Sequence, residues 1–252
     1  MTGNTRVAEH RFDAGLEVFR YHLPGFGVVP GALLLAGHVA MNTESAAVAT
    51  FSDVRFTDFV RPGETFVYGA GSRPGEVTVT AGDRTCAGFT AGHDTTFDEE
   101  TDSVASLAPR PTPAGLRPEE FWFLPESLLV GENEAGCSLD LDEILRAQPY
   151  LGHLTGWRTL VLLECLGNLA LCLQHLTPPK SSTPSDRVPQ YVFARFGRLR
   201  LRTGADFRRG TLTARTRVRR FGSILVWEGE ITDGADMYLT VRDAVSTIWR
   251  AR

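Results

Sequence analysis

Lysine is nearly absent from this chain of 252 residues. Lys180 is the only lysine among 26 basic residues, so arginine carries almost all of the positive charge. The formal net charge of −4 argues against generic nucleic-acid binding, which depends on excess positive charge close to phosphates. Many of the arginines nevertheless lie between Arg195 and Arg220. This segment predicts a solvated basic face of a sheet or, as an alternative, a docking surface for a small acidic protein.

The chain also has few cysteines and no long hydrophobic run. No segment approaches the roughly 20 apolar residues that span a bilayer, and no apolar stretch typical of a secretory signal follows the polar start, Met1–Arg6. We therefore expect a cytoplasmic protein that binds neither membranes nor nucleic acid. The cysteines show no C-x-x-C spacing, which favours buried reduced thiols over disulfides or metal ligands. They are Cys86, Cys137, Cys165 and Cys172.

What the sequence does contain is two halves with the same order of elements. In each half, a nearly wholly apolar helix precedes a series of β-rich segments that are separated by turn residues. In the first half the predicted helix covers Ala32–Asn42, and the predicted strands are Arg6–Phe12, Leu16–Tyr21, Ala46–Val60, Thr65–Gly71, Glu76–Ala81 and Thr85–Gly92. In the second half the predicted helix covers Leu160–Leu176, and the predicted strands are Ser127–Leu141, Gln190–Leu201, Gly210–Arg220, Ser223–Thr232 and Met237–Asp243.

The composition changes between the two halves. Residues 94–118 are rich in Asp, Glu, Ser, Thr and Pro, which is typical of an exposed linker. We therefore expect a first unit at residues 1–93 and a second unit at residues 119–252. A helix that is apolar on all sides must be covered on most of them. One curved antiparallel sheet wrapped around a central helix achieves this, and two such units joined edge to edge give an α+β fold with a continuous sheet.

The segment from Tyr21 to Gly31 carries the most informative motif. Its sequence, Tyr-His-Leu-Pro-Gly-Phe-Gly-Val-Val-Pro-Gly, sets His22 just before two Pro-Gly turns, and the second turn opens the first predicted helix. Histidine titrates near neutral pH, and the first turn of a helix has backbone N–H groups without intrahelical acceptors. The segment therefore predicts a base beside a site that can bind a carbonyl oxygen or an anion.

The second predicted helix contributes an acid. Glu164 lies in the run Leu-Val-Leu-Leu-Glu-Cys-Leu, where a buried carboxylate is costly unless it is paired or functional. An exposed helix edge is the alternative explanation for this residue, and a structural loop histidine is the alternative for His22.

These motifs resemble those of the hot-dog fold 3-hydroxyacyl-acyl-carrier-protein dehydratases of fatty acid and polyketide synthesis. In that family an H-x-P-G motif is followed by a second P-G and by a helix that carries an acid and, four residues later, a glutamine. The loop from His22 to Gly31 has the same spacing, and the turn Phe59–Glu64 is similar to a later turn of the family. The resemblance implies that each site pairs the histidine of one hot-dog unit with the acid of the facing unit.

The resemblance further implies a fused double hot-dog with one working site. The first helix has Ala36 at the acid position, whereas the second helix has Glu164 there and Asn168 in place of the glutamine. The corresponding loop of the second half is degraded, and an ungapped count back from Glu164 places Tyr150 rather than His153 at the histidine position. We expect this reciprocal site, which would face Ala36, to be inactive.

The resemblance implies a role for each site residue in the elimination of water. His22 is the expected base that removes the C2 proton, and Glu164 the expected acid that protonates the departing hydroxyl. The N–H of Gly31 is expected to bind the thioester oxygen. Asn168 would orient Glu164 or satisfy a backbone group, and Phe26 and Trp157 would line an acyl tunnel, with core packing as their alternative role.

The leading hypothesis is therefore a dehydratase of a (3R)-3-hydroxyacyl thioester. It needs no metal or redox cofactor, and its expected partner is an acyl carrier protein bearing a 3-hydroxyacyl phosphopantetheine thioester. A homodimer or a complex with a second dehydratase subunit is compatible with the sequence. The alternatives are a non-catalytic partner subunit, an acyl thioesterase and an enoyl isomerase. Four further histidines are expected to be structural or on the surface: His38, His93, His153 and His175.

Overall fold

The computed structural model describes most of the chain. It covers residues 9–16, 18–21, 27–42, 48–97, 107–112, 124–176, 191–203, 211–222 and 224–248. The strands within these ranges form one continuous twelve-stranded sheet in which all neighbours are antiparallel. In spatial order they are β1 (Glu9–Arg11), β3 (Thr65–Ala70), β4 (Glu76–Ala81), β5 (Arg84–Asp94), β2 (Val48–Phe56), β9 (Tyr191–Arg202), β12 (Met237–Ile248), β11 (Ile224–Thr232), β10 (Thr211–Phe221), β8 (Glu134–Asp140), β7 (Ser127–Val130) and β6 (Ala108–Pro111).

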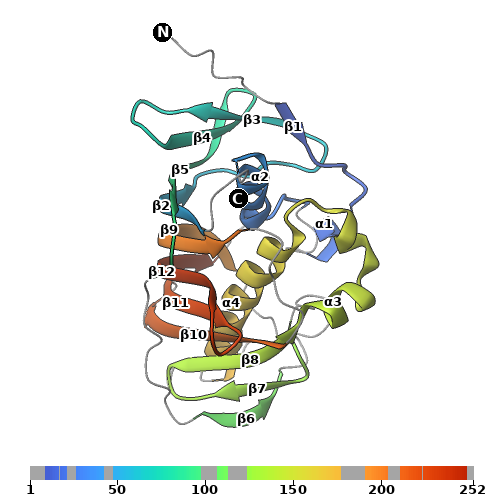
Figure 1. The fold of residues 1–252 in the computed structure, drawn as a ribbon, viewed down its shortest axis with the longest axis vertical. Coiled ribbons are helices and arrows are strands. Elements are labelled where there is room, and N and C mark those ends of the chain that lie inside the picture. The colour runs from blue at the N-terminus through green and yellow to red at the C-terminus, as the bar shows by residue number, and fades with distance from the viewer. Residues whose placement is uncertain are drawn as a thin grey trace.

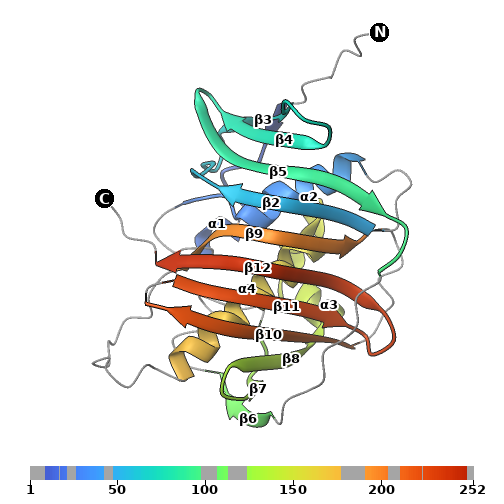
Figure 2. The ribbon, with the colours of Figure 1, turned by 90° about the vertical axis from the view of Figure 1, so that its left-hand side faces the viewer.

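The strand order contains the same arrangement twice. From the middle outwards, one half reads β2-β5-β4-β3-β1 and the other reads β9-β12-β11-β10-β8. The halves meet where β2 pairs with β9, with Phe51 opposite Leu199, and the strands lie in one open sheet (Figure 2). The strands β7 and β6 extend only the second half. This confirms the predicted α+β fold, in which two antiparallel units share a continuous sheet.

Each unit wraps its part of the sheet around one long helix. Helix α2 (Gly31–Asn42) precedes β2, and helix α4 (Trp157–Leu176) precedes β9. Both helices lie on the concave side of the sheet and pack against each other (Figure 1). Residues 32–36 of α2 and residues 159–173 of α4 are all buried, as expected for helices that are apolar around most of their circumference. None of the helices in the described part of the chain has the length and hydropathy needed to cross a membrane.

Close contacts at glycines seat both helices on the sheet. A Cβ atom added to Gly31 would lie 2.7 Å from the ring of Phe56 on β2, and one added to Gly167 would lie 2.6 Å from the ring of Phe193 on β9. Polar contacts add to this packing, since the Tyr68 hydroxyl donates to the Leu34 carbonyl oxygen at 2.5 Å. The position of each helix is therefore set by backbone-to-ring contacts that a larger residue would push apart.

Several predicted elements differ from the structure. The segment Leu16–Tyr21 was expected to be a strand, but it contains helix α1 (Val18–Tyr21), which follows a turn in which the Leu16 N–H donates to the Asp13 carbonyl oxygen. Val18 and Phe19 are both buried, although a strand would turn adjacent side chains to opposite faces. A run this short does not distinguish a helix from a strand by its periodicity.

The predicted strand Ser127–Leu141 is two strands and the start of a helix. It splits into β7 and β8, and Leu141 begins helix α3 (Leu141–Ala147). The Asp140 side chain caps α3 by accepting a hydrogen bond from the Glu143 N–H at 2.9 Å. A 3-10 helix, η2 (Pro149–His153), then leads towards α4. Within the expected linker, the exposed residues 108–111 form strand β6, which pairs with β7.

The ring of His38 packs inside the first unit against aromatic side chains. It lies on α2, with ring centroids 5.1 Å from Phe89, 5.7 Å from Tyr68 and 6.1 Å from Phe51. Burial, and secondarily the proximity of His93, lower the pKa of His38 to about 4. This agrees with a structural role for His38, while His93 is exposed.

We therefore expect stability to fall as the pH drops from about 6.5 to about 4. In this window the unfolded chain binds a proton at His38 that the folded protein does not, so the free energy of unfolding decreases on acidification. Because the ring is only partly enclosed, we expect a loss of about 1–2 kcal/mol. Urea unfolding at pH 7 and pH 4.5 measures this loss, and His38→Phe should show a smaller one. An identical pH dependence in both proteins would contradict this role.

Candidate active site

Glu164 is a buried carboxyl group on the central helix of the second unit. Its residue is 7% exposed, and its neighbours Leu163 and Cys165 are fully buried. The helix that holds it starts just after Gly156, where the Leu160 N–H donates to the Gly156 carbonyl oxygen at 3.2 Å. The predicted alternative, an exposed helix edge, is therefore wrong. A carboxyl group in such an apolar run is costly to the fold.

Asn168 lies one helical turn after Glu164 and is 4% exposed. Residues four apart on a helix are neighbours on one face, so the amide and the carboxyl group project from the same side of α4. Between them, the Leu166 carbonyl oxygen accepts a hydrogen bond from the Thr216 hydroxyl at 3.0 Å. This bond ties the segment that bears both polar side chains to strand β10 of the sheet.

Cys165, the residue after Glu164, packs against strand β8. Its sulfur lies 3.8 Å from that of Cys137 on β8, and burial raises the pKa of the Cys165 thiol well above its usual value. Burial likewise raises the pKa of Cys172 to about 12. All four cysteines are free and buried, as predicted. Protonated buried thiols are poor nucleophiles, so Cys165 does not compete with Glu164 for a chemical role.

The N-terminus of α2 provides the second element of the site. Gly31 is its first residue, and the preceding Val28, Val29 and Pro30 are buried. Hydrogen bonds hold the segment on either side of Gly31. The Val29 N–H donates to the Val60 carbonyl oxygen and the Leu33 N–H donates to the Pro30 carbonyl oxygen, both at 2.9 Å. The first N–H groups of a helix are oriented towards a ligand and carry positive partial charge. The Gly31 N–H is therefore suited to bind an oxygen that acquires negative charge.

Two of the predicted site residues, His22 and Phe26, lie outside the described residues. The structure places the segments on both sides of them, since α1 ends at Tyr21 and the chain is described again from Gly27. The role of His22 thus remains a prediction from the sequence motif, and so does that of Phe26. Trp157 is the first residue of α4 and is half-buried, with the Arg158 guanidinium carbon 5.2 Å from its ring centroid.

The reciprocal position, where the first unit would hold its acid, is a tight helix contact. Ala36 is fully buried, and a Cβ atom added to Gly156 would lie 2.6 Å from the Ala36 Cβ. In the adjoining 3-10 helix, His153 is exposed and Tyr150 is half-buried. The inactivity of the reciprocal site stays a prediction from the sequence. The close contact between Gly156 and Ala36 was not foreseen from the sequence.

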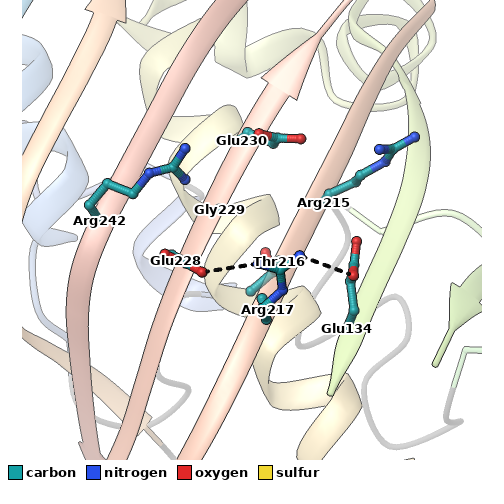
Figure 3. Close-up of a pocket in the computed structure, with 8 residues that line it drawn as sticks. All are labelled: Glu134, Arg215, Thr216, Arg217, Glu228, Gly229, Glu230 and Arg242. Atoms are coloured by element: carbon teal, nitrogen blue, oxygen red, sulfur yellow. Dashed lines mark hydrogen bonds and ion pairs between the residues drawn. The ribbon is translucent and has the colours of Figure 1, made fainter. Parts of the chain in front are cut away.

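No cluster of three or more metal-ligating side chains occurs in the described part of the chain. A shallow hollow does occur, on the outer face of the sheet (Figure 3). There Arg217 pairs with Glu134 at 3.7 Å and with Glu228 at 3.5 Å. Helix α4, which carries Glu164, lies behind the sheet from this hollow, so the hollow is not part of the predicted site. Its lining residues are Glu134, Arg215, Thr216, Arg217, Glu228, Gly229, Glu230 and Arg242.

This chain is similar in structure to several known proteins. No protein-family model matches the sequence, and no curated protein matches it either. The dehydratase domain of PpsC from Mycobacterium tuberculosis, solved in complex with C12:1-CoA, superimposes with a TM-score of 0.66 at 16% identity, covering 96% of this chain and 93% of that domain.

Two further structures show the range of activities on this architecture. The dehydratase CurJ, in an inactive variant with histidine replaced by phenylalanine, matches with a TM-score of 0.61 at 12% identity, covering 87% of this chain and 82% of that one. An enoyl-isomerase of a trans-acyltransferase polyketide synthase matches with a TM-score of 0.60 at 10% identity, covering 96% of this chain and 99% of that one. The chain therefore has the double hot-dog fold of polyketide synthase dehydratase domains.

Proposed function

We propose that this chain is a dehydratase that removes water from a (3R)-3-hydroxyacyl thioester on an acyl carrier protein and gives a trans-2-enoyl thioester. The observation that carries the proposal is the buried carboxyl group of Glu164, at 7% exposure, on a central helix of the double hot-dog fold. The histidine motif at His22 leads into the other central helix. The two groups supply the base and the acid that this elimination needs.

The reaction divides between these groups without a redox change. His22 takes the C2 proton, and the electrons of the C2–H bond form the C2=C3 double bond. The C3–O bond breaks as Glu164 gives its proton to the hydroxyl group, which leaves as water. Gly31 donates its N–H to the thioester oxygen, which carries negative charge as the C2 proton departs. Such acid–base groups contribute about 10²–10⁴-fold each, and one oxyanion donor about 10²–10³-fold.

The approximate two-fold relation of the units supports the pairing of His22 with Glu164. Gly156, which contacts Ala36, lies eight residues before Glu164, and Val28 lies eight residues before Ala36. Exchange of the two units therefore turns the Gly156–Ala36 contact into one between Val28 and Glu164. On this relation, we infer that the Glu164 carboxyl group faces the described end of the loop before α2, at residues 27–31.

The solved structures support the choice of chemistry. The PpsC domain was solved with an acyl-CoA thioester, and the CurJ variant that lacks a histidine is inactive. In this chain the corresponding proposals are an acyl thioester substrate and a catalytic His22. The match to an enoyl-isomerase favours a second candidate function, movement of the double bond along an enoyl chain, because the same base and acid can transfer both protons.

We place the docking of the acyl carrier protein on the helix side, next to the loop before α2. Most arginines of β9 and β10 alternate with buried core residues and face outwards. Arg220 is an exception, since it donates to the Leu173 carbonyl oxygen on α4 at 3.0 Å. Several of the others are paired on that face: Arg200 with Asp94 at 2.9 Å, Arg202 with Asp236 at 3.2 Å, and Arg217 with two glutamates. This face therefore has less unneutralised positive charge than its arginine content predicts. It also lies on the other side of the sheet from α4, which carries Glu164.

Replacing either proposed catalytic group should slow the elimination strongly. We expect His22→Ala and Glu164→Gln each to lower the rate of water loss by about 10²–10⁴-fold, because each removes one proton-transfer group. Mass spectrometry of a 3-hydroxyacyl carrier protein measures the loss of water, and circular dichroism checks the fold. His153→Ala, at an exposed position, serves as the control and should keep its rate. Full activity in either variant would contradict the assignment.

The reaction products distinguish dehydration from its rivals. A dehydratase leaves the thioester bond intact, so a thiol reagent should detect no free thiol while enoyl thioester accumulates. Thiol release without enoyl formation would indicate a thioesterase. Starting from the 2-enoyl thioester, appearance of a shifted double bond would indicate isomerisation. Activity that appears only when a second dehydratase subunit is added would indicate a non-catalytic partner.

A further inference from the structure

The contact between Gly156 and Ala36 joins the two halves of the proposed site. Gly156 directly precedes α4, which carries Glu164, and Ala36 lies on α2, whose N-terminus is at Gly31. A Cβ atom at Gly156 would lie 2.6 Å from the Ala36 Cβ and 3.3 Å from its carbonyl carbon and oxygen. Real Cβ atoms do not approach a neighbour to 2.6 Å, so only glycine allows the present separation of these segments.

The backbone conformation adds a second requirement for glycine. Gly156 has a φ of +77°, in the left-handed region that other residues adopt only with strain. The turn that starts α4 is also held by hydrogen bonds, because the Trp157 N–H donates to the Leu154 carbonyl oxygen at 3.2 Å. The backbone conformation of Gly156 thus sets the direction in which α4 starts, and the contact with Ala36 sets the distance between the start of α4 and α2.

The partner position has a matching requirement for a small side chain. Ala36 is fully buried, and a longer side chain there would extend towards Gly156. It is also the position at which the resemblance places the acid of a second site. A close contact between Gly156 and Ala36 therefore lies where the resemblance places the acid of the reciprocal site.

We infer that Gly156 and Ala36 are positioning residues, whose contact sets the distance from Glu164 on α4 to the Gly31 N–H at the start of α2. This inference rests on the proposed function, because it assigns Glu164 and Gly31 to one reaction. Both groups belong to helices that are seated on the sheet, so a shift at the contact moves one group relative to the other. A displacement of about 1 Å between reacting groups can cost about 10²-fold in rate.

Gly156→Ala tests the role against a matched control. We expect its kcat to fall by about 10–100-fold with little change in KM, because the substrate still binds while the acid is displaced. The control is Gly82→Ala in the turn between β4 and β5, where φ is +57° and an added Cβ atom meets nothing within 4 Å. It carries the same kind of backbone strain without the contact, so its kcat should stay within about twofold of the wild type.

Removal of the partner methyl group should reverse the effect. In Ala36→Gly/Gly156→Ala the 2.6 Å approach is gone but the strain at position 156 remains. We expect kcat to recover by about tenfold over Gly156→Ala, while the urea midpoint stays below that of the wild type. A purely structural role predicts instead that kcat follows the unfolding midpoint in all variants, and that result would overturn the inference.

Two further outcomes are separable. If Gly156→Ala does not fold, Ala36→Val enlarges the same contact without a positive φ and should lower kcat in the same way; an unchanged kcat would overturn the inference. If the wild-type chain eliminates no water, the proposed function fails and the positioning role fails with it. The urea midpoints of the wild type, Gly156→Ala, Ala36→Gly and the double variant would then still show whether Gly156 and Ala36 are coupled.

Discussion

The structure depends on the burial of two almost wholly apolar helices under one antiparallel sheet. Neither α2 nor α4 has a polar face that could be left to water, so each needs a curved sheet on one side and the other helix beside it. Contacts at Gly31 and Gly167 bring both helices close to the aromatic rings of the central strands. The close packing of the core therefore fixes the positions of the side chains that these helices carry.

This constraint explains how a costly acid can be kept in place. Glu164 belongs to a helix that the core requires, between leucines that cannot be exposed without loss of the fold. The two units differ at the helix position that holds Glu164 in the second unit and Ala36 in the first. On one side the helix presents Glu164 and Asn168, and on the other Ala36 closes against Gly156. The first unit thus has a structural contact at the position where the second unit has a buried carboxyl group.

Much of the fold was predictable from local patterns. The two apolar helices and the strands between turn residues were predicted within a few residues, because periodicity and turn chemistry are local properties. Helix α1 was missed because a short run of Val18 and Phe19 fits either a helix or a strand. Helix α3 was missed because its cap, Asp140, ends a strand directly, and β6 was missed because its prolines are typical of a linker.

The candidate site was predictable only in part, for a related reason. Motif spacing identified Glu164, and the structure shows that it is buried. The contact between Gly156 and Ala36 joins residues far apart in the chain, so no local sequence pattern predicts it. The pairing of the arginines of β9 and β10 with acidic residues likewise depends on neighbouring strands.

The central claim is that His22 of one unit and Glu164 of the other act on the same substrate. The most direct measurement is a crystal structure of Glu164→Gln with an unreacted 3-hydroxyacyl thioester bound. We predict that the C3 hydroxyl group lies within hydrogen-bond distance of the side chain at position 164, and that the His22 ring faces C2 from the other unit. A substrate bound away from position 164, or with C2 turned away from His22, would contradict the account.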